Sequence, residues 1–406
     1  MTADSEFSRR KFLATLGVGG GALGAGLLLG DAPLAHAVGG APGFDPKVTR
    51  PASPPRALPL PGERVHEFDI DLTIQVHEIL PGVKIHAFTY NKTLPGPEIR
   101  VPEGDWVLVN FTNRTSEFHT IHWHGIMLAN EMDGVPGGTQ WGVGPDQTFK
   151  YLFRAQPSGT HFYHCHNMTP LHIQAGMYGA LIIEPKVDPI KHVFPYDREY
   201  TLILGEMDTL MIEQGMNEML KMMNTMEAMN RSPNLMREMN GRMMGMFLNK
   251  KAFTDAVNSG YLPPYLTAMA GKVARPNMNY FVINGKSYPM TEELRIKTGE
   301  RIRIRLINAG VMSHFMHLHG HDFWQVCQDG AALAQPLRLN TVPVHPGGTA
   351  DIIVEGTNPG MWHFHDHSDL STTNNGHFPG GMMTMLMYDD AAEHGVKVPD
   401  IIQVDS

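Results

Sequence analysis

Residues 161–177 read His-Phe-Tyr-His-Cys-His-Asn-Met-Thr-Pro-Leu-His-Ile-Gln-Ala-Gly-Met. The stretch places Cys165 directly between two histidines and adds two side chains with metal-binding atoms, His172 and Met177. With His119 from upstream, it offers one thiol, two imidazoles and one thioether, which is the donor set of a blue-copper site. A lone cysteine is more often a small buried hydrophobic residue. The histidines on both sides of Cys165 argue strongly against that alternative.

The segments around this stretch indicate a β-rich fold. Short apolar or alternating runs, separated by turn sequences such as Leu94–Pro97, fill one region from Val65 to about Pro185 and another from about Tyr200 to Tyr388. This spacing predicts a β-sandwich in each region. The clearest runs are Trp106–Phe111, Ala180–Ile183, Tyr280–Ile283, Arg301–Ile307 and Asp351–Val354.

The two regions repeat one pattern of metal-binding side chains. Three leading histidines are followed by a histidine pair, a further histidine and a methionine, with nearly the same gaps. Only the gap before the last histidine differs, at five residues against nine. Such a repeat implies duplicated folding units. The first set is His119, His122, His124, His164, His166, His172 and Met177, and the second is His314, His317, His319, His365, His367, His377 and Met382.

Each set contains two pairs with His-x-His spacing. Because residues i and i+2 of a strand point to the same face, each pair can present two imidazoles to one place. Four pairs supply eight neutral nitrogen donors, which suits copper. One pair alone is weak evidence, since a single histidine is more often on the surface or satisfied in the core. Four pairs in two matched sets argue against that alternative.

Together these motifs resemble the multicopper oxidases, over essentially Phe68 to Tyr388. The resemblance rests on His122-Trp123-His124-Gly125, Asp133-Gly134-Val135-Pro136, His164-Cys165-His166 and His317-Leu318-His319-Gly320-His321. It implies an all-β chain of two cupredoxin-like Greek-key β-sandwich domains with four coppers: one type 1, one type 2 and two type 3. The implied ligands are His119, Cys165, His172 and Met177 for type 1, His122 and His317 for type 2, and His124, His164, His166, His319, His365 and His367 for type 3.

The second region departs from the familiar laccases, which have three domains and keep His-Cys-His near the C-terminus. Here that position holds His365-Asp366-His367. Without a thiolate no blue site is expected there, and no metal is expected at Asp366. The pattern resembles two-domain members with the type 1 copper in domain 1. In those proteins three chains close a ring, with each cluster between domain 1 of one chain and domain 2 of the next, so the resemblance implies a homotrimer.

Several other polar residues lie next to these motifs. Asp133 resembles the acidic residue that assists proton delivery near the type 2 copper, and it is also a typical turn residue; the two roles are compatible. Asp366 and Asp369 are weaker candidates for a second acid. Structural or supporting roles are favoured for His161, His321 and His363. Cys327 lies in the run Phe323–Cys327, which predicts a strand with a buried thiol.

Thirteen methionines fall between Met207 and Met246. Six of them recur at three- and four-residue steps, which predicts one face of a helix. These six are Met216, Met219, Met222, Met223, Met226 and Met229. A methionine face is more often core than ligand, but Leu, Ile and Val are few here. Methionine-rich inserts in similar oxidases accompany Cu(I) oxidation and copper tolerance. Cu(I) binding and an adaptable docking or trimer surface therefore both stay open.

The N-terminus predicts export. Ser8–Leu13 resembles the twin-arginine motif, an apolar run extends to Gly30, and Ala35–Ala37 fits a cleavage site. A membrane anchor or a disordered tail is the alternative, but the run is short for a spanning helix. We therefore predict a periplasmic or secreted protein without a stable membrane anchor. The predicted division is a signal peptide (1–37), a Pro/Gly-rich lead-in (38–63), cupredoxin domain 1 (64–187), domain 2 (188–390) with a methionine-rich insert (207–250), and a C-terminal tail (391–406).

The sequence thus predicts an oxidase that passes single electrons from a phenol, aromatic amine or Cu(I) to O₂, through Cys165. The net charge of −9 argues against nucleic acid as a partner. One alternative is a copper nitrite reductase, which shares the two-domain plan but needs only three histidines at its catalytic copper. A periplasmic copper-binding or tolerance protein is the other alternative. It fits the methionines but not a complete electron path.

Overall fold

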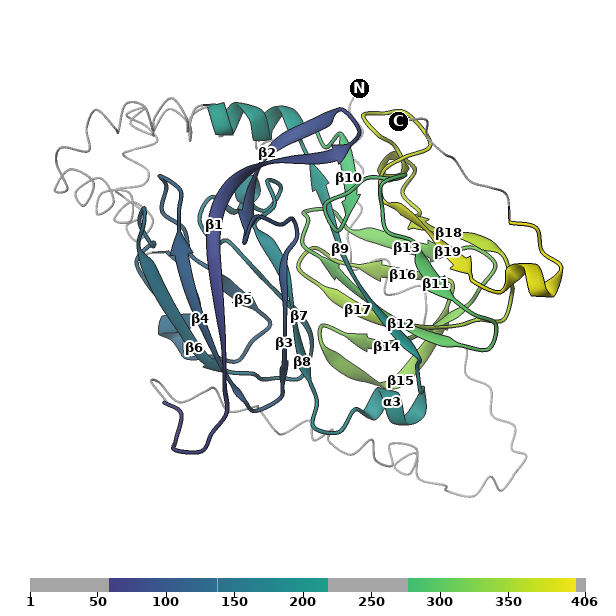
Figure 1. The fold of residues 1–406 in the computed structure, drawn as a ribbon, viewed down its shortest axis with the longest axis horizontal. Coiled ribbons are helices and arrows are strands. Elements are labelled where there is room, and N and C mark those ends of the chain that lie inside the picture. Colours follow the sequence, from purple (N-terminus) through teal and green to yellow (C-terminus); the bar gives the residue numbers. More distant parts are fainter. Residues whose placement is uncertain (1–57, 137, 218–276, 399–406) are drawn as a thin grey trace, which may run out of the picture. The chain divides into compact units, whose positions relative to one another are not determined.

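The computed structural model describes residues 58–136, 138–217 and 277–398 (Figure 1). The predicted signal peptide, most of the lead-in, most of the methionine-rich insert and the end of the tail lie outside these residues. The domain boundaries therefore stay predictions. Across the described ranges, no helix combines the length and apolar character needed to cross a membrane.

The first part of the described chain forms two four-stranded sheets, here called the first sandwich (Figure 1). The strand orders are β2-β1-β4-β6 and β3-β8-β7-β5. Parallel neighbours distant in sequence, β1 beside β4 and β3 beside β8, require connections that cross between the sheets. The strands are β1 (Val65–Leu80), β2 (Val83–Tyr90), β3 (Gly96–Pro102), β4 (Trp106–Asn113), β5 (His122–His124), β6 (Thr148–Arg154), β7 (Gly159–His164) and β8 (Tyr178–Glu184).

The remaining strands form a six-stranded sheet, β10-β9-β12-β17-β14-β15, and a five-stranded sheet, β11-β19-β18-β13-β16, here called the second sandwich. The strands are β9 (Arg198–Met207), β10 (Tyr280–Ile283), β11 (Leu294–Ile296), β12 (Arg301–Asn308), β13 (His314–Leu318), β14 (Phe323–Gln328), β15 (Ala331–Leu339), β16 (Thr341–Val344), β17 (Thr349–Glu355), β18 (Met361–Asp366) and β19 (Met383–Tyr388). Helical elements are short: α2 (Thr169–His172), α3 (Pro189–Val193), η2 (Asn130–Met132), η3 (Asp369–Thr372), η4 (Ala391–His394) and the helical residues 209–217.

All five apolar runs singled out in the sequence are strands, as predicted. β4 alternates buried and partly buried side chains, because one of its faces packs on the core. β8 and β12 are buried over nearly their whole length, since both lie inside their sheets. The run that contains Cys327 is β14, also as predicted, and its thiol is buried.

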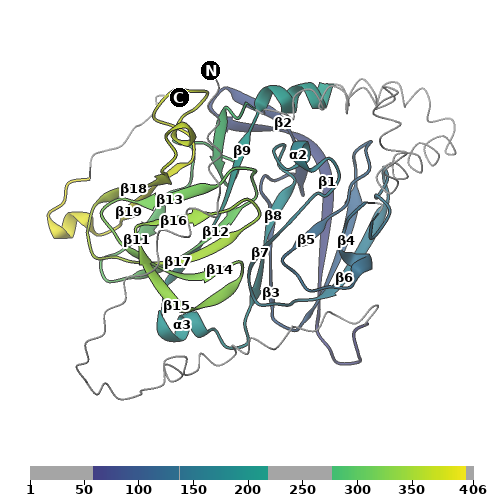
Figure 2. The same ribbon diagram turned by 180° about the vertical axis from the view of Figure 1, so that it is seen from behind.

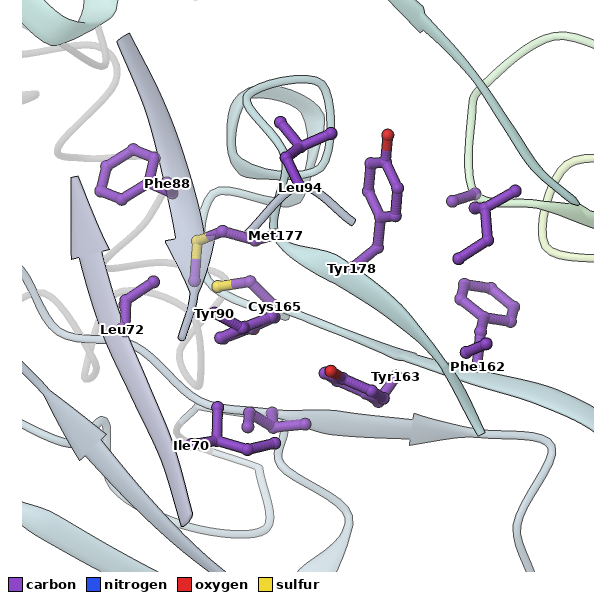
Figure 3. Close-up of a cluster of buried hydrophobic side chains, with 14 of the residues drawn as sticks. Ile70, Leu72, Phe88, Tyr90, Leu94, Phe162, Tyr163, Cys165, Met177 and Tyr178 are labelled. Carbon is purple, nitrogen blue, oxygen red and sulfur yellow. The ribbon is translucent and has the colours of Figure 1, made fainter. Parts of the chain in front are cut away.

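Each sandwich has an apolar core, and the first core also takes in residues of β9, β10 and β12, such as Ile203, Val282 and Ile307. The first core includes Tyr90, Tyr163 and Phe88 and surrounds Cys165 and Met177 (Figure 3). The second core is built largely from Leu, Ile and Val, half of which lie on β9, β12 and β17. The thiol of Cys165 is therefore enclosed by close-packed aromatic and aliphatic groups that exclude water.

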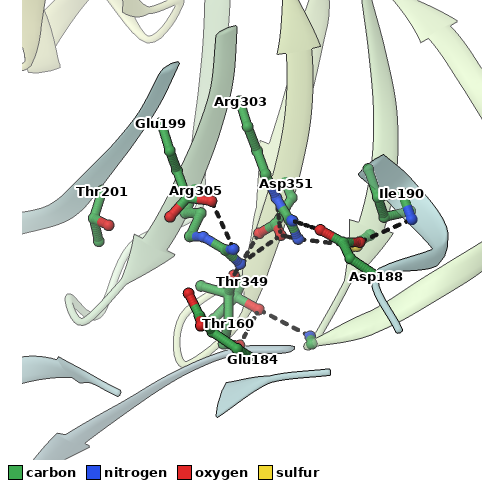
Figure 4. Close-up of polar contacts among 12 residues, drawn as sticks. Thr160, Glu184, Asp188, Ile190, Glu199, Thr201, Arg303, Arg305, Thr349 and Asp351 are labelled. Atoms are coloured by element: carbon green, nitrogen blue, oxygen red, sulfur yellow. Dashed lines mark hydrogen bonds and ion pairs between the residues drawn. The ribbon is translucent and has the colours of Figure 1, made fainter. Parts of the chain in front are cut away.

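A buried charge network joins β7 of the first sandwich to β12 and β17 of the second (Figure 4). Asp351 Oδ2 accepts hydrogen bonds from Arg303 Nη2 at 2.6 Å and Arg305 Nη1 at 3.2 Å. Asp351 Oδ1 accepts from the Thr160 hydroxyl at 2.7 Å. Burial alone would lower the pKa of Arg303, but the Asp351 carboxylate outweighs it and raises that pKa. The network explains why two arginines can lie inside β12.

Candidate metal centres

Cys165 follows the last residue of β7, where the chain turns toward α2. Its Sγ lies 3.6 Å from His119 Nδ1 and 3.5 Å from His172 Nδ1. Met177 lies next to Cys165, since its carbonyl accepts a 3.1 Å hydrogen bond from the Cys165 amide. The four predicted type 1 ligands are almost completely buried. Figure 3 shows Cys165 and Met177 turned toward one space inside the first core.

The donor set and its spacing fit a bound first-row metal ion. Bonds of about 2.0 Å to nitrogen and about 2.3 Å to sulfur, at a roughly tetrahedral angle, separate the two atoms by about 3.5 Å. The separations from Cys165 Sγ to His119 and His172 match that value. One soft thiolate and two imidazoles, with a thioether nearby, favour copper.

The two imidazoles of this centre differ in their surroundings. Burial lowers the pKa of His119 well below 6.5, and the neighbouring His172 lowers it further. Burial also acts to lower the pKa of His172, but hydrogen bonds to the Cys165 sulfur and the Glu117 carboxylate raise it to about 10. Glu117 Oε2 lies 3.3 Å from His172 Nε2. A metal ion must therefore displace a proton from His172 in the metal-free chain.

The first histidine quartet (His122, His124, His164 and His166) gathers where β5 meets β7. His122 lies opposite His164 in the antiparallel ladder. The ring centroids of His122 lie 5.7, 5.2 and 5.4 Å from those of the other three. Burial, with smaller contributions from neighbouring imidazoles, lowers the pKa of His164 to about 3 and of His124 to about 4. Both are therefore neutral near pH 7, as metal binding requires.

The second histidine quartet (His317, His319, His365 and His367) repeats this arrangement on β13 and β18. His317 lies opposite His365 in the ladder, as His122 does opposite His164. The ring centroids of His317 lie 5.1, 5.9 and 5.4 Å from those of the other three. Among the described residues, no ring contact joins the two quartets within one chain.

Backbone carbonyls orient four of these rings. His122 Nδ1 donates to the Asp133 carbonyl and His317 Nδ1 to the Asn340 carbonyl, both at 2.8 Å. His164 and His365 donate from Nδ1 to the carbonyl of the residue that follows each, at 2.9 and 2.8 Å. With Nδ1 engaged, Nε2 is the ring atom left to bind a metal, and in His164 and His365 it faces another imidazole nitrogen, that of His124 at 3.4 Å and that of His319 at 2.9 Å. The sequence repeat thus corresponds to a repeated orientation of the histidine rings.

Asp133 caps the short helix η2 and touches His122. Its Oδ1 lies 3.3 Å from His122 Nδ1, in addition to the bond made by its carbonyl. The next residue, Gly134, has φ +80°, and a Cβ there would fall 1.8 Å from the Ile121 carbonyl oxygen. Only glycine lets this turn approach β5 so closely. Asp133 is therefore a turn residue, and its carboxylate also lies beside the ring of His122.

The position that would match the blue site in the second sandwich holds a hydrogen-bonded trio. His314 Nδ1 lies 2.8 Å from Asp366 Oδ2, and His314 Nε2 lies 2.6 Å from Glu206 Oε1. Burial alone would lower the pKa of His314, but these two carboxylates raise it to about 9. His377 does not join them, because it is exposed and bridges back to Asn374. Both His314 nitrogens are thus engaged by carboxylate oxygens.

The remaining histidines and the second cysteine have other partners. His321 uses both ring nitrogens, one with the His319 carbonyl at 3.0 Å and one with the Tyr388 hydroxyl at 2.6 Å. His161 Nε2 donates to the Pro157 carbonyl at 3.0 Å. The His363 ring contacts that of His319. Burial, with Asp351 nearby, raises the pKa of the Cys327 thiol.

A cleft of about 360 Å³ opens beside His124. Segments of both sandwiches line it, among them His161, Asp329, His345 and Thr349. The sequence singled out neither Asp329 nor the carboxylates Glu117 and Glu206. An acidic residue within an otherwise apolar run, such as Glu206 in Leu202–Met207, is the signal that could have identified one of them.

The start of the methionine-rich insert is helical over residues 209–217 and packs on the first sandwich (Figure 2). Met207, Met211 and Met216 are buried in the core that surrounds Cys165. Glu213 accepts a 2.7 Å bond from the His86 amide on β2. The other methionines of the predicted stripe lie outside the described residues. These first methionines are thus core residues of the cluster that also contains Cys165.

Comparisons with known proteins agree with these features. Residues 73–188 and 260–392 each match a family model described as multicopper oxidase. A copper resistance protein A homolog from Pseudomonas syringae pv. tomato is 31% identical over 317 residues, which cover 75% of this chain and 50% of that protein. The chain spans about half the length of the curated relatives it matches.

Two solved structures are similar over most of both chains. The blue copper oxidase from Nitrosomonas europaea is 33% identical, with a TM-score of 0.64 over 80% of this chain and 87% of that one. The multicopper oxidase mgLAC is 32% identical, with a TM-score of 0.65 over 84% and 89%. These likenesses confirm the predicted all-β, cupredoxin-like fold and the family resemblance.

Proposed function

The chain belongs to the multicopper oxidase family, and we propose that it couples one-electron oxidation of a reducing substrate to the four-electron reduction of O₂ to water. One observation carries this proposal. Cys165 lies 3.6 and 3.5 Å from the two imidazoles of a blue-copper donor set, while its neighbours in the chain belong to a histidine quartet. One peptide segment therefore serves both kinds of centre.

Copper, when bound, would supply the one-electron redox chemistry and the reduction of O₂. We propose four coppers per chain, held as one type 1, one type 2 and two type 3. The type 1 ligands are His119, Cys165, His172 and Met177, the type 2 ligands are His122 and His317, and the type 3 ligands are His124, His164, His166, His319, His365 and His367. The orientation of Nε2 in four of these rings supports this assignment.

The chain around Cys165 provides the path between the two centres. Covalent bonds join its thiol to the imidazoles of His164 and His166 through adjacent residues. A hydrogen bond from His164 Nδ1 to the Cys165 carbonyl, at 2.9 Å, adds a second connection. The apolar packing of the first core keeps water from Cys165.

Reduction of O₂ to water consumes four protons, and Asp133 is the proposed residue that delivers them. Its carboxylate is about one-third exposed, so it can exchange protons with solvent. Its Oδ1 also lies 3.3 Å from the ring of His122, a proposed type 2 ligand. The bond from His122 to its carbonyl holds this contact in place.

Each cluster is proposed to form between two chains of a homotrimer. Within one chain, no ring contact among the described residues joins the two quartets. The second quartet is also the more open of the two, with His319 and His367 exposed. Exposed imidazoles at the end of a sheet are suited to complete a site with a neighbouring subunit.

The reducing substrate is proposed to be Cu(I) or a small phenol or aromatic amine. A cleft of about 380 Å³ near His119 is lined by Glu131, Met132, Trp141 and Phe149, among others, and can hold a molecule of that size. Val143 also lines this cleft, and its backbone exchanges two hydrogen bonds with the backbone of His119, a proposed type 1 ligand. Relatives named copper resistance protein A favour Cu(I). Periplasmic or secreted location by twin-arginine export belongs to the same proposal.

Oxygen uptake by the copper-loaded protein, with Cu(I) and separately with a phenol, tests the proposal. Uptake with either reductant is the expected result. Nitrite consumption without oxygen uptake would favour a copper nitrite reductase instead. Tight copper binding with neither activity would favour a copper-binding or tolerance protein.

A further inference from the structure

The backbone hydrogen bonds around Cys165 in the first sandwich match those around Asp366 in the second. The Cys165 amide donates to the Met177 carbonyl at 3.1 Å, and the Asp366 amide donates to the Met382 carbonyl at 3.0 Å. A buried asparagine amide supports the preceding loop in each, at 2.9 Å: Asn113 to the Val143 carbonyl and Asn308 to the Val344 carbonyl. Asp366 therefore takes the place of Cys165, and His314 that of His119.

Within this shared frame the side chains differ. His119 Nδ1 and Cys165 Sγ stand 3.6 Å apart, which leaves room for an ion between them. His314 Nδ1 and Asp366 Oδ2 stand 2.8 Å apart, so they bond directly. His119 Nε2 has no hydrogen-bond partner among the described residues, whereas His314 Nε2 reaches Glu206 at 2.6 Å. A hydrogen-bonded trio thus fills the space that a metal would need.

The trio is closed and fully buried. The side chains of Glu206, His314 and Asp366 are all 0% exposed. Backbone amides also donate to both carboxylates, those of Val311 and Met312 to Glu206 and those of Phe315 and Ser368 to Asp366. Because a carboxylate oxygen accepts hydrogen bonds, each ring nitrogen of His314 is engaged by its own carboxylate, that of Asp366 or that of Glu206.

Asp366 is also the residue between His365 and His367. The rings of this pair lie 5.8 Å apart at an interplanar angle of 29°. In the first quartet, the rings on either side of Cys165 lie 6.2 Å apart at 24°. Since neighbouring residues of an extended chain point to opposite sides, anchoring the middle side chain inward directs both flanking rings outward.

We propose that Glu206, His314 and Asp366 replace the mononuclear metal ion in the second sandwich and act as positioning residues for His365 and His367. The inference rests on the proposed function, because it takes those two histidines as copper ligands. Glu206 on β9 holds His314 on β13, and His314 holds Asp366 on β18, so three strands fix the direction of the pair. Residues that support metal ligands in this way typically contribute 10–100-fold to metal affinity.

The test compares Asp366→Asn and Glu206→Gln, both close to isosteric, with the exposed Asp369→Asn as the matched control. Copper binding is followed by titration, with type 1 copper read from the blue absorption and type 2 and type 3 copper from their own spectra. We expect the two trio variants to need about 10–100-fold more free copper to fill the type 2 and type 3 sites. The blue absorption per chain, which reports the first sandwich, should match that of the control.

Unchanged affinity at the type 2 and type 3 sites in both variants would overturn the proposal. It would do so even if the metal-free variants unfolded more easily, because that combination indicates a purely structural role. Should one variant lack the blue absorption through misfolding, the other decides. A wild-type chain that binds no copper at the paired histidines would refute the proposed function instead.

Discussion

Asp351→Ala should destabilise the protein far more than removal of an exposed carboxylate. Asp351 is fully buried and accepts hydrogen bonds from three side chains, at distances from 2.6 to 3.2 Å. Arg303 and Arg305 are each only 4% exposed, so water cannot replace the lost carboxylate. Two buried cations would then face the same space without their shared anion.

The loss of folding free energy depends on which carboxylate partners the two arginines retain in the variant. Arg303 retains Asp188 at 3.3 Å, and Arg305 retains Glu199 at 2.7 Å. Breaking a buried ion pair by removing one partner costs about 3–5 kcal/mol. Because each arginine keeps one carboxylate, we expect about 3 kcal/mol, a large part of a typical folding free energy of about 5–15 kcal/mol.

The assay is denaturant unfolding followed by tryptophan fluorescence, since the chain has 5 tryptophans. The matched control is Glu355→Ala, which removes a half-exposed carboxylate 3.4 Å from Arg301 on the neighbouring part of the same strands. Pairs of that kind contribute about 0–1 kcal/mol. Equal shifts of the unfolding midpoint in the two variants would refute the reasoning about the buried network.

Three further outcomes follow from the site. Asp133→Asn should slow oxygen reduction while the blue absorption stays intact, and unchanged turnover would exclude the proton role. Gly134→Ala should lower stability by more than about 1 kcal/mol, because its Cβ would overlap the Ile121 carbonyl oxygen at positive φ; a thermal midpoint equal to wild type would contradict this. The pKa of His314 is raised from 6.5 to about 9, so the folded metal-free chain gains roughly 3 kcal/mol that is present below about pH 6.5 and is lost as the pH rises through 9. Stability measured between pH 6 and 9 should therefore fall more in wild type than in His314→Gln, and parallel profiles would speak against the buried charge.

Much of the fold was predictable because strand signals are local. The alternating run that begins at Trp106 needs one buried face. The predicted turn Leu94–Pro97 was right only for Leu94 and Pro95, because Gly96 and Pro97 already belong to β3. The gathering of the histidines into two quartets was predictable for a similar reason, since His-x-His spacing on a strand fixes a common face. Both features can be read within a few residues.

The parts that escaped prediction depend on contacts between distant segments. Glu206 meets His314 across 108 positions of sequence, and Thr160 meets Asp351 across 191. His377 matches His172 in order and in its distance from the following methionine, yet it lies exposed because the longer preceding loop carries it away. The sequence pattern therefore includes His377, but in the folded chain the group that contacts His314 Nε2 is the carboxylate of Glu206.

The central claim is that electrons enter through Cys165 alone, and a count of coppers per chain in wild type and Cys165→Ser tests it most directly. Native mass spectrometry should find four coppers in wild type and three in Cys165→Ser, with the blue absorption lost in the variant. Cys327→Ser, the second buried cysteine, should keep all four and the colour. Five or more tightly held coppers in wild type, or a blue absorption that survives in Cys165→Ser, would contradict the account.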